Sequence, residues 1–227
     1  MNKRSHSFAP IAVAAVLVIA TSHVLIAEQN AGFVGVVGNW SHVDDGGAAF
    51  KVDTTGWSGT TDRAALQSLS RSLFATVNDT FVTNGTAPEA FPIAVHSATS
   101  SFTKGTLSVR FKLVGGVRDF TAGIMFNLKS NGEYMFVRYN TLDGNIALWR
   151  FRNGARERVL GGEMETQLAK NTWHELSMTV SGNALSARVN DGALKQDFTL
   201  TEPVAGRVGL WTKREAVTVF RDFRVTP

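Results

Sequence analysis

The sequence predicts an all-β fold: a two-sheet antiparallel β-sandwich of the jelly-roll type, with one short helix. From about residue 105 to the C-terminus, apolar and polar residues alternate in short segments, and turn dipeptides separate many of these segments. Asn-Gly and Asp-Gly tolerate the positive φ that tight hairpins need, so each dipeptide is predicted to join two antiparallel strands. Many short strands at this spacing are typical of sandwiches and jelly rolls. The dipeptides are Asn131-Gly132, Asp143-Gly144, Asn153-Gly154, Gly182-Asn183 and Asp191-Gly192.

The alternation also places individual strands in the second half of the chain. In the first of them, Leu107, Val109 and Phe111 alternate with Ser108 and Arg110, as in a strand that buries one face. Sequential antiparallel pairing, with crossings between two sheets, is the natural topology for such a series. The strands that follow are predicted at Thr121–Leu128, Glu133–Asn140, Asn145–Arg152, Glu157–Leu160, His174–Val180, Leu185–Asn190, Lys195–Leu200, Arg207–Thr212 and Val217–Val225.

The first half of the chain contains fewer strands. Two opening strands are expected at Phe33–Trp40 and Ala48–Val52. Residues 78–104 are rich in Asn, Thr, Ser and Pro, and we interpret them as a long connection. The connection includes one short apolar piece, Phe91–Val95. We expect this piece to be an edge strand, because Pro92 has no backbone N–H to donate within a ladder.

One helix is predicted, at residues 61–74. Its apolar residues recur at the spacing that places them on one helical face. Thr61 is expected to cap the helix, with Asp62 in its first turn. The apolar face consists of Leu66, Leu69 and Leu73.

Residues 1–27 are interpreted as a secretory signal peptide. Two basic residues near the start precede an apolar stretch that begins at Ile11, and small residues suited to cleavage follow, with cleavage after Ser22 or Ala27. The alternative is an uncleaved membrane anchor, because the apolar stretch reaches about 17 residues, the short limit of a span. We therefore expect an extracytoplasmic protein, periplasmic or secreted. It is not inserted in the membrane if the segment is cleaved, and is anchored there if the segment is retained.

Composition limits the remaining possibilities. Residues 28–227 are expected to form a single domain, since a sandwich of this length buries one substantial core. Removal of Lys3 and Arg4 lowers the formal net charge from +4 to +2, and no basic run indicates nucleic-acid binding. The chain has no cysteine, which excludes thiolate metal sites and cysteine catalysis. Its stability must therefore come from the core and not from disulfides.

Three stretches of the second half carry a resemblance to a known family. They read RYNTLDGNIALW at residues 138–149, WHEL at 173–176, and GRVGLWTK at 206–213 followed by VTVFRDF at 217–223. Together they resemble the exported bacterial 3-keto-disaccharide-hydrolase-like domains, which belong to the concanavalin A-like lectin/glucanase and laminin-G jelly rolls. The resemblance covers residues 105–227. It implies a jelly roll with a concave sheet, a carbohydrate-type ligand and an extracytoplasmic setting.

No complete catalytic motif is present. Glycoside hydrolysis normally uses two carboxylates about 5–5.5 Å apart in retaining enzymes and about 6.5–9.5 Å apart in inverting ones. Glu163 and Glu165 have i, i+2 spacing, but they lie in a segment that reads as a solvated loop. The other candidates are His174, Asp119 and Glu133. His174 falls on the apolar face of its strand, so it is either a packing residue or a general base.

Arg138 and Asn140 are the first candidates for ligand binding. They share one face of the predicted strand 133–140 with Tyr134 and Phe136. Arginine offers a planar fork of donors, and asparagine offers both a donor and an acceptor, so both suit sugar hydroxyls. The structural alternative is that Arg138 pairs with Asp119 or with the aspartate at position 143.

Trp149, Trp211 and Lys213 complete the set of binding candidates. Either indole is suited to form the apolar platform on which a pyranose ring lies. The alternative is that both tryptophans are core or corner residues. Lys213 follows Trp211 in a turn, where it either contacts the ligand or is an ordinary surface charge.

No metal or other cofactor is expected. No second histidine lies at zinc-ligand spacing from His174. Asp44 and Asp45, in a Gly-rich turn, are the residues that would hold calcium, as in several laminin-G relatives. Two adjacent acids without a third ligand in the sequence are weak support for such a site.

The sequence therefore favours an exported domain that recognises a saccharide on its concave sheet. One alternative is a glycoside hydrolase or lyase that acts on 3-keto-disaccharides, and another is a laminin-G-like adhesion or structural module. A deep pocket with a histidine or a carboxylate of perturbed pKa would favour the enzyme. A groove lined by Trp, Arg and Asn would favour the binding domain, and a flat apolar face would favour the adhesion module.

Overall fold

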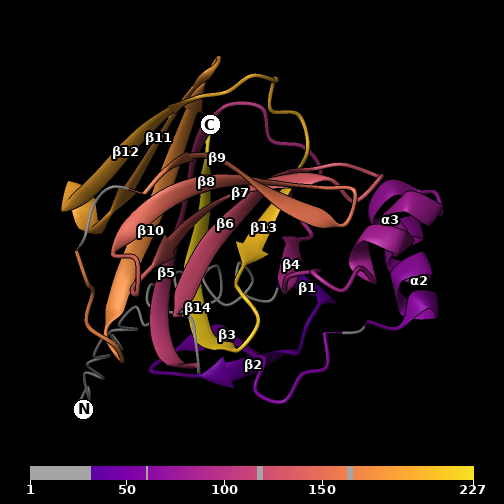
Figure 1. Cartoon of the computed structure of the whole chain (residues 1–227), viewed down its shortest axis with the longest axis horizontal. Coiled ribbons are helices and arrows are strands. Elements are labelled where there is room, and N and C mark those ends of the chain that lie inside the picture. The colour runs from indigo at the N-terminus through magenta and orange to yellow at the C-terminus, as the bar shows by residue number, and fades with distance from the viewer. Residues whose placement is uncertain (1–31, 60, 117–119, 163–165) are drawn as a thin grey trace, which may run out of the picture.

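The computed structural model describes residues 32–59, 61–116, 120–162 and 166–227. In this part of the chain, two seven-stranded antiparallel sheets form two layers, and two α-helices lie together at one side of the sandwich (Figure 1). The predicted all-β sandwich is confirmed. Residues 1–27, interpreted above as a signal peptide or anchor, lie outside the described residues. Within the described ranges, no helix is both long enough and apolar enough to cross a membrane.

The two sheets draw their strands from both halves of the chain. The first sheet has the order β1-β4-β13-β6-β7-β8-β9, and the second has the order β12-β11-β10-β5-β14-β3-β2. The first sheet consists of β1 Phe33–Val37, β4 Ile93–His96, β13 Arg207–Trp211, β6 Thr121–Leu128, β7 Tyr134–Asn140, β8 Asn145–Arg152 and β9 Ala155–Gly161. The second consists of β12 Leu194–Thr199, β11 Ala184–Val189, β10 Trp173–Ser181, β5 Gly105–Gly116, β14 Ala216–Thr226, β3 Ala48–Asp53 and β2 Trp40–Asp44.

Every predicted turn dipeptide lies between two strands that pair with each other. The pairs are β6 with β7, β7 with β8, β8 with β9, β10 with β11, and β11 with β12. Asn153 and Asp191 adopt positive φ values of 52° and 54°, as tight turns require. A short 3₁₀ turn, η1 Asn190–Gly192, makes the last of these connections.

The first predicted strand is wrong as a single unit. Residues 33–40 divide into β1 in the first sheet and β2 in the second, so the chain crosses between the layers there. The crossing takes place at Gly38, whose φ is +91°. A Cβ atom at this position would lie 2.8 Å from Pro92 Cβ, so both the backbone conformation and the packing favour glycine.

The interpretation of residues 78–104 as a connection with an edge strand also needs correction. The segment contains a second helix, α3 Asp79–Gly85, which follows helix α2 Arg63–Phe74. Strand β4 is not an edge strand, because it pairs with β1 on one side and β13 on the other. Pro92 lies just before β4 and contributes only its carbonyl oxygen, which accepts a hydrogen bond from the Thr212 backbone N–H. The proline therefore does not interrupt the ladder.

The first sheet buries both of its faces over much of its area, so every residue of β7 is buried. Met135, Val137 and Tyr139 belong to the core between the two sheets. Tyr134 and Phe136 belong to a second core on the outer face, which is the face turned away from the second sheet. The two helices cover this second core with Leu66, Leu73, Phe81 and Val82.

Candidate functional site

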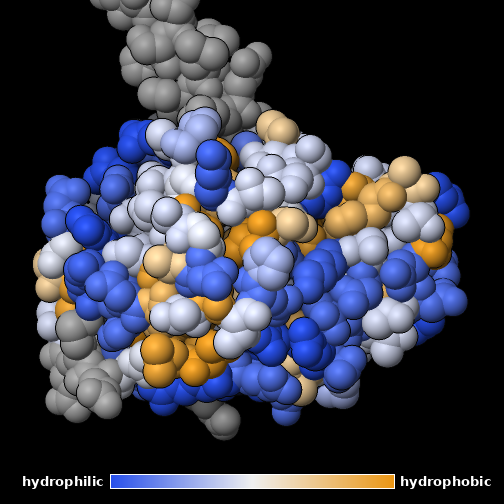
Figure 2. Space-filling view, turned by 90° about the horizontal axis from the view of Figure 1, so that it is seen from above, coloured by the Kyte–Doolittle hydropathy of each residue, from blue (hydrophilic) through white to orange (hydrophobic). Residues whose placement is uncertain are grey.

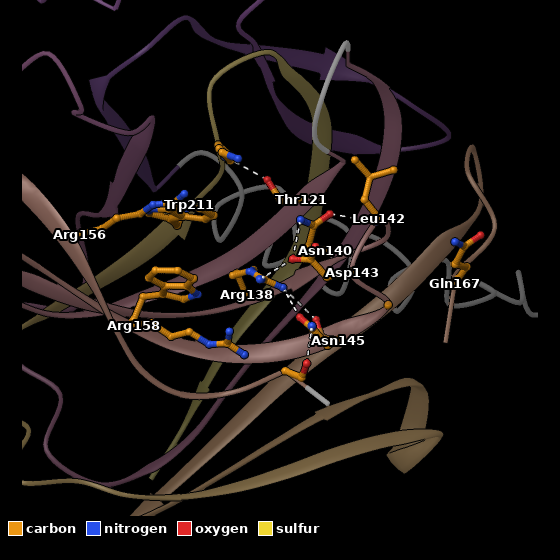
Figure 3. A pocket seen from close by; sticks show the side chains of 14 residues that line it. Thr121, Arg138, Asn140, Leu142, Asp143, Asn145, Arg156, Arg158, Gln167 and Trp211 are labelled. Carbon is orange, nitrogen blue, oxygen red and sulfur yellow. Dashed lines mark hydrogen bonds and ion pairs between the residues drawn. The ribbon is translucent and has the colours of Figure 1, made fainter. Parts of the chain in front are cut away.

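The candidate site is a cavity of about 890 Å³ on the outer face of the first sheet (Figure 3). Strand β7 determines its position. Tyr134 and Phe136 lie in the second core, whereas Arg138 and Asn140, further along the same face, line the cavity. A strand places every second side chain on one face. The side chains of Tyr134, Phe136, Arg138 and Asn140 therefore all face outward, and the residues between them face the core between the two sheets.

A series of aromatic rings forms one wall of the cavity. The Phe136 ring is parallel to the Trp211 ring, with 4.0 Å between centroids, and to the Trp149 ring, with 6.4 Å between centroids. Trp211 is buried and Trp149 is half-buried. The guanidinium of Arg156 lies 4.6 Å from the Trp149 ring centroid and 5.1 Å from the Phe91 ring centroid. A cation already contacts the Trp149 ring, so this residue is a poor open platform for a sugar.

Arg138 is buried and held by two partners. Its Nη1 donates to the Asn145 carbonyl oxygen at 3.2 Å and also to Asn145 Oδ1, and its Nη2 donates to Asp143 Oδ2 at 2.8 Å. Asn140 Nδ2 donates to the same Asp143 oxygen at 3.0 Å. A guanidinium has five N–H groups, and these contacts use three of them. The side chain is therefore fixed in orientation and keeps capacity to donate to a ligand.

A second set of contacts positions Arg158. Asn145 Nδ2 donates to the Gly162 carbonyl oxygen at 3.1 Å. The guanidinium of Arg158 lies directly over Gly162, because a Cβ atom built on this glycine would collide with Arg158 Nη2. Gly162 has a φ of +110°, a conformation that also favours glycine. The absence of a side chain at position 162 thus leaves the space that Arg158 occupies at the cavity wall.

The side chains of the cavity carry an excess of positive charge. Among the described lining residues, Arg138, Arg156, Arg158 and Lys213 are cationic, and Asp143 is the one carboxylate. Burial lowers the pKa of Arg138. Repulsion from Arg156 and Arg158 also lowers it, and attraction to Asp143 acts in the opposite direction. The described lining residues therefore create a potential that favours anionic groups.

Two smaller cavities extend the site into a groove. One, of about 260 Å³, shares Arg156 and Lys213 with the main cavity and reaches Pro88 and Glu89. The other, of about 480 Å³, shares Arg158 and Gly162 with it and continues toward the outer edge of β9. Because lining residues are shared at both junctions, the two smaller cavities adjoin the main one, and we refer to the three together as the groove.

All five predicted binding residues line the main cavity. Arg138 and Asn140 come from β7, Trp149 from β8 and Trp211 from β13, and Lys213 follows β13. The Lys213 backbone N–H donates to Thr121 Oγ1 at 3.0 Å, which fixes the chain where it leaves the sheet. Arg138 also pairs with Asp143, one of the two aspartates that its alternative structural role would use.

Two of the predicted catalytic residues, His174 and Glu133, do not join this group. His174 packs on Phe111; its Nε2 lies 2.9 Å from the Ala169 carbonyl oxygen, and Asn190 Nδ2 donates to its Nδ1 at 2.9 Å. Glu133 forms an ion pair with Arg152 at 3.3 Å, and neither it nor His174 lines the main cavity. Asp119 and the pair Glu163 and Glu165 lie outside the described residues.

The two calcium candidates have protein partners. Asp44 Oδ1 accepts a hydrogen bond from the Gly47 backbone N–H at 2.9 Å, and Asp45 forms an ion pair with Lys112. In the part of the chain that the structure describes, no three histidine or acidic side chains are grouped so that they could hold a metal ion.

The sequence did not indicate Arg156, Arg158 and Asn145 as site residues. Arg156 lies outside the predicted strand Glu157–Leu160, which begins two residues later than β9. The i, i+2 spacing of the two arginines was a usable signal, since it places both on one face of a strand. Their register partners in β8 are Phe151 for Arg156 and Trp149 for Arg158, which also face outward.

At the level of sequence, the chain matches no known family profile and no curated protein. Solved structures do resemble it. The carbohydrate-binding module CBM66 from Bacillus subtilis superposes with a TM-score of 0.59 at 16% identity, covering 85% of this chain and 93% of the module. The GH43 protein BlXynB from Bacillus licheniformis gives a TM-score of 0.48 at 13% identity, covering 82% of this chain and 34% of that protein. The galectin LEC-6 from Caenorhabditis elegans gives a TM-score of 0.39 at 15% identity, covering 54% of this chain and 84% of the galectin.

The fold is thus a two-sheet jelly-roll sandwich, as expected from the resemblance in the second half of the chain. The narrower resemblance, to 3-keto-disaccharide-hydrolase-like domains, has no support at the level of sequence. A likeness at 16% identity defines the architecture and not the ligand.

Proposed function

We propose that this protein is an exported carbohydrate-binding jelly-roll domain that recognises a saccharide in the groove on the outer face of its first sheet. The observation that carries the proposal is the lining of the main cavity. It combines the oriented fork of Arg138 with the amides of Asn140 and Asn145. Such groups match the hydroxyls of a sugar.

The fold is consistent with this proposal, because a solved structure that it resembles over most of its length is itself a carbohydrate-binding module. The adhesion alternative would need a flat apolar face without a cleft. The face seen in Figure 2 is mainly hydrophilic and carries hydrophobic residues in small groups. Among the described residues, the large exposed hydrophobic side chains are far apart in the sequence: Val34, Val114, Leu142, Leu160 and Val225.

The hydrolase alternative finds less support in the described part of the groove. The main cavity has one described carboxylate, Asp143, and no described histidine. A pair of carboxylates that flank a glycosidic bond is therefore not formed by these residues. Asp143 is also engaged by Arg138 and Asn140.

Titration calorimetry with the full chain and a panel of neutral and acidic oligosaccharides tests the proposal. Arg138→Lys keeps the charge but removes the planar fork, and we expect it to weaken binding by about tenfold. Arg188→Lys, at an exposed position on β11, is the matched control and should bind as the wild type does. Lys213→Ala provides a second variant at the cavity in case Arg138→Lys unfolds.

The outcomes separate the three functions. Binding without product release supports the proposal, and wild-type affinity in both cavity variants would disprove the site assignment. Product release from 3-keto-disaccharides would establish the hydrolase or lyase alternative. If no saccharide in the panel binds or raises the melting temperature, the carbohydrate proposal fails.

Export is part of the proposal and is supported by the sequence pattern of residues 1–27. Expression of the full chain, followed by cell fractionation and N-terminal sequencing, tests it. We expect an extracytoplasmic product that begins at His23 or Glu28. Recovery of a chain in the membrane fraction that still begins with the apolar segment would instead support the anchor.

A further inference from the structure

Arg156 and Arg158 differ from the other arginines of this hairpin. They lie at i, i+2 on the outer face of β9, and among the described residues neither has a carboxylate partner. On the neighbouring strand, Arg150 and Arg152 both lie near Glu202, and Arg152 is also 3.3 Å from Glu133. Among the described residues, acidic partners are thus present for the arginines of β8 but not for the two arginines of β9.

The two guanidinium groups are nevertheless held in place. Arg156 lies against the Trp149 and Phe91 rings, and Arg158 lies over Gly162, next to Asn145. Each is therefore positioned by contacts that, among the described residues, include no carboxylate. Like charges at neighbouring positions of one strand face are unfavourable, unless an anion lies between them or beside them.

We propose that the ligand of this groove is an acidic saccharide, with a carboxylate or sulfate group bound by Arg156 and Arg158. This inference rests on the proposed function, because it names the chemical class of the saccharide. A planar guanidinium donates two parallel hydrogen bonds to the oxygens of a carboxylate or sulfate, and the charge of the acceptor makes these bonds stronger than those to neutral hydroxyls. Arg138, next to them, adds a third positive charge to the same cavity.

The experiment compares saccharides that differ only in charge. Oligogalacturonate and its methyl ester probe the carboxylate, and a sulfated chondroitin oligosaccharide and its unsulfated form probe the sulfate. We expect the full chain to bind at least one acidic member about tenfold more tightly than its less charged counterpart at about 50 mM salt. The preference should decrease as the salt concentration rises, because ions screen the charges.

Variants assign the preference to residues. Arg156→Gln and Arg158→Gln should each reduce the preference for the acidic member while leaving the melting temperature close to that of the wild type. Arg188→Gln removes the same charge from the second sheet, at an exposed position, and should leave the preference unchanged.

The failure of this inference can be distinguished from failure of the proposed function. Equal or tighter binding of both less charged counterparts would overturn the acidic-ligand inference while leaving saccharide binding established. A preference that survives both β9 variants, or that Arg188→Gln abolishes equally, would overturn the assignment to Arg156 and Arg158. No binding of any saccharide would overturn both proposals.

Discussion

At the scale of single residues, the sequence left open whether Trp211 is a platform for a sugar or a residue of the core. The structure places it in the core, with only 1% of its surface exposed. Its ring stacks on Phe136 at a centroid distance of 4.0 Å and contacts Phe91 at 5.5 Å. Trp211 also lines the cavity, so one side chain supports both the second core and the site.

Trp211→Ala should therefore act mainly on stability. Removal of a buried tryptophan leaves a cavity, and we expect the free energy of unfolding to fall by about 3–5 kcal/mol. Trp211→Phe, which keeps an aromatic ring, should have a smaller effect. Urea denaturation measures both changes, and a Trp211→Ala variant that is fully stable yet does not bind would show that the ring is a ligand platform.

His96 is the residue that we expect to make stability depend on pH. It is buried between Phe33 and Phe223, with ring centroids 5.2 Å and 5.0 Å away. Its Nδ1 lies 2.8 Å from Thr99 Oγ1. Burial lowers the pKa of this imidazole below its ordinary value of 6.5. The folded protein therefore binds the proton less readily than the unfolded chain does.

The sign of the effect follows from this difference. The contribution of His96 is fully present above the unfolded pKa of 6.5 and is lost as the pH falls below it. Between about pH 7.5 and about pH 5.5, the loss is at most about 1.4 kcal/mol. We expect His96→Gln to lose less free energy of unfolding than the wild type over this range in urea titrations. An identical loss in both proteins would contradict this assignment.

At the scale of secondary-structure elements, the start of helix α2 is determined by its N-cap residue. The N-cap of helix α2 lies one residue later than predicted: it is Asp62, not Thr61, and its Oδ1 accepts a hydrogen bond from the Ala65 backbone N–H at 2.8 Å. Asp62→Ala should therefore reduce the free energy of unfolding by about 1 kcal/mol. Thr61→Ala is the matched control with a smaller expected effect, and the reverse order in urea denaturation would contradict the assigned cap.

The elements that the sequence misplaced all depend on partners distant in the chain. Hairpins such as β8–β9 follow from a turn dipeptide and local alternation, so they were predictable. Strand β4 lies between β1 and β13, and its pairing with β13 joins residues more than 100 positions apart. Helix α3 is a short element whose Phe81 and Val82 are buried in the second core. Its pattern is too brief to predict before that core is known.

For the whole molecule, the groove predicts a dependence on ligand length. The flanking cavities of about 260 Å³ and about 480 Å³ share lining residues with the main cavity at both of its ends. A longer saccharide therefore contacts more of the groove. We expect a tetrasaccharide to bind about tenfold more tightly than the matching disaccharide in calorimetry. Equal affinities would show that only the main cavity is used.

The sequence by itself determined the all-β class and the hairpins of the second half, because alternation and turn chemistry act between neighbouring residues. It also indicated Arg138 and Asn140 as candidates, since both share a strand face. Only the tertiary structure decided that Trp211 is buried, that Arg156 and Arg158 join the same cavity, and that His174 does not. These outcomes depend on which strands become neighbours in a sheet, and pairing across long separations is not encoded in any local pattern.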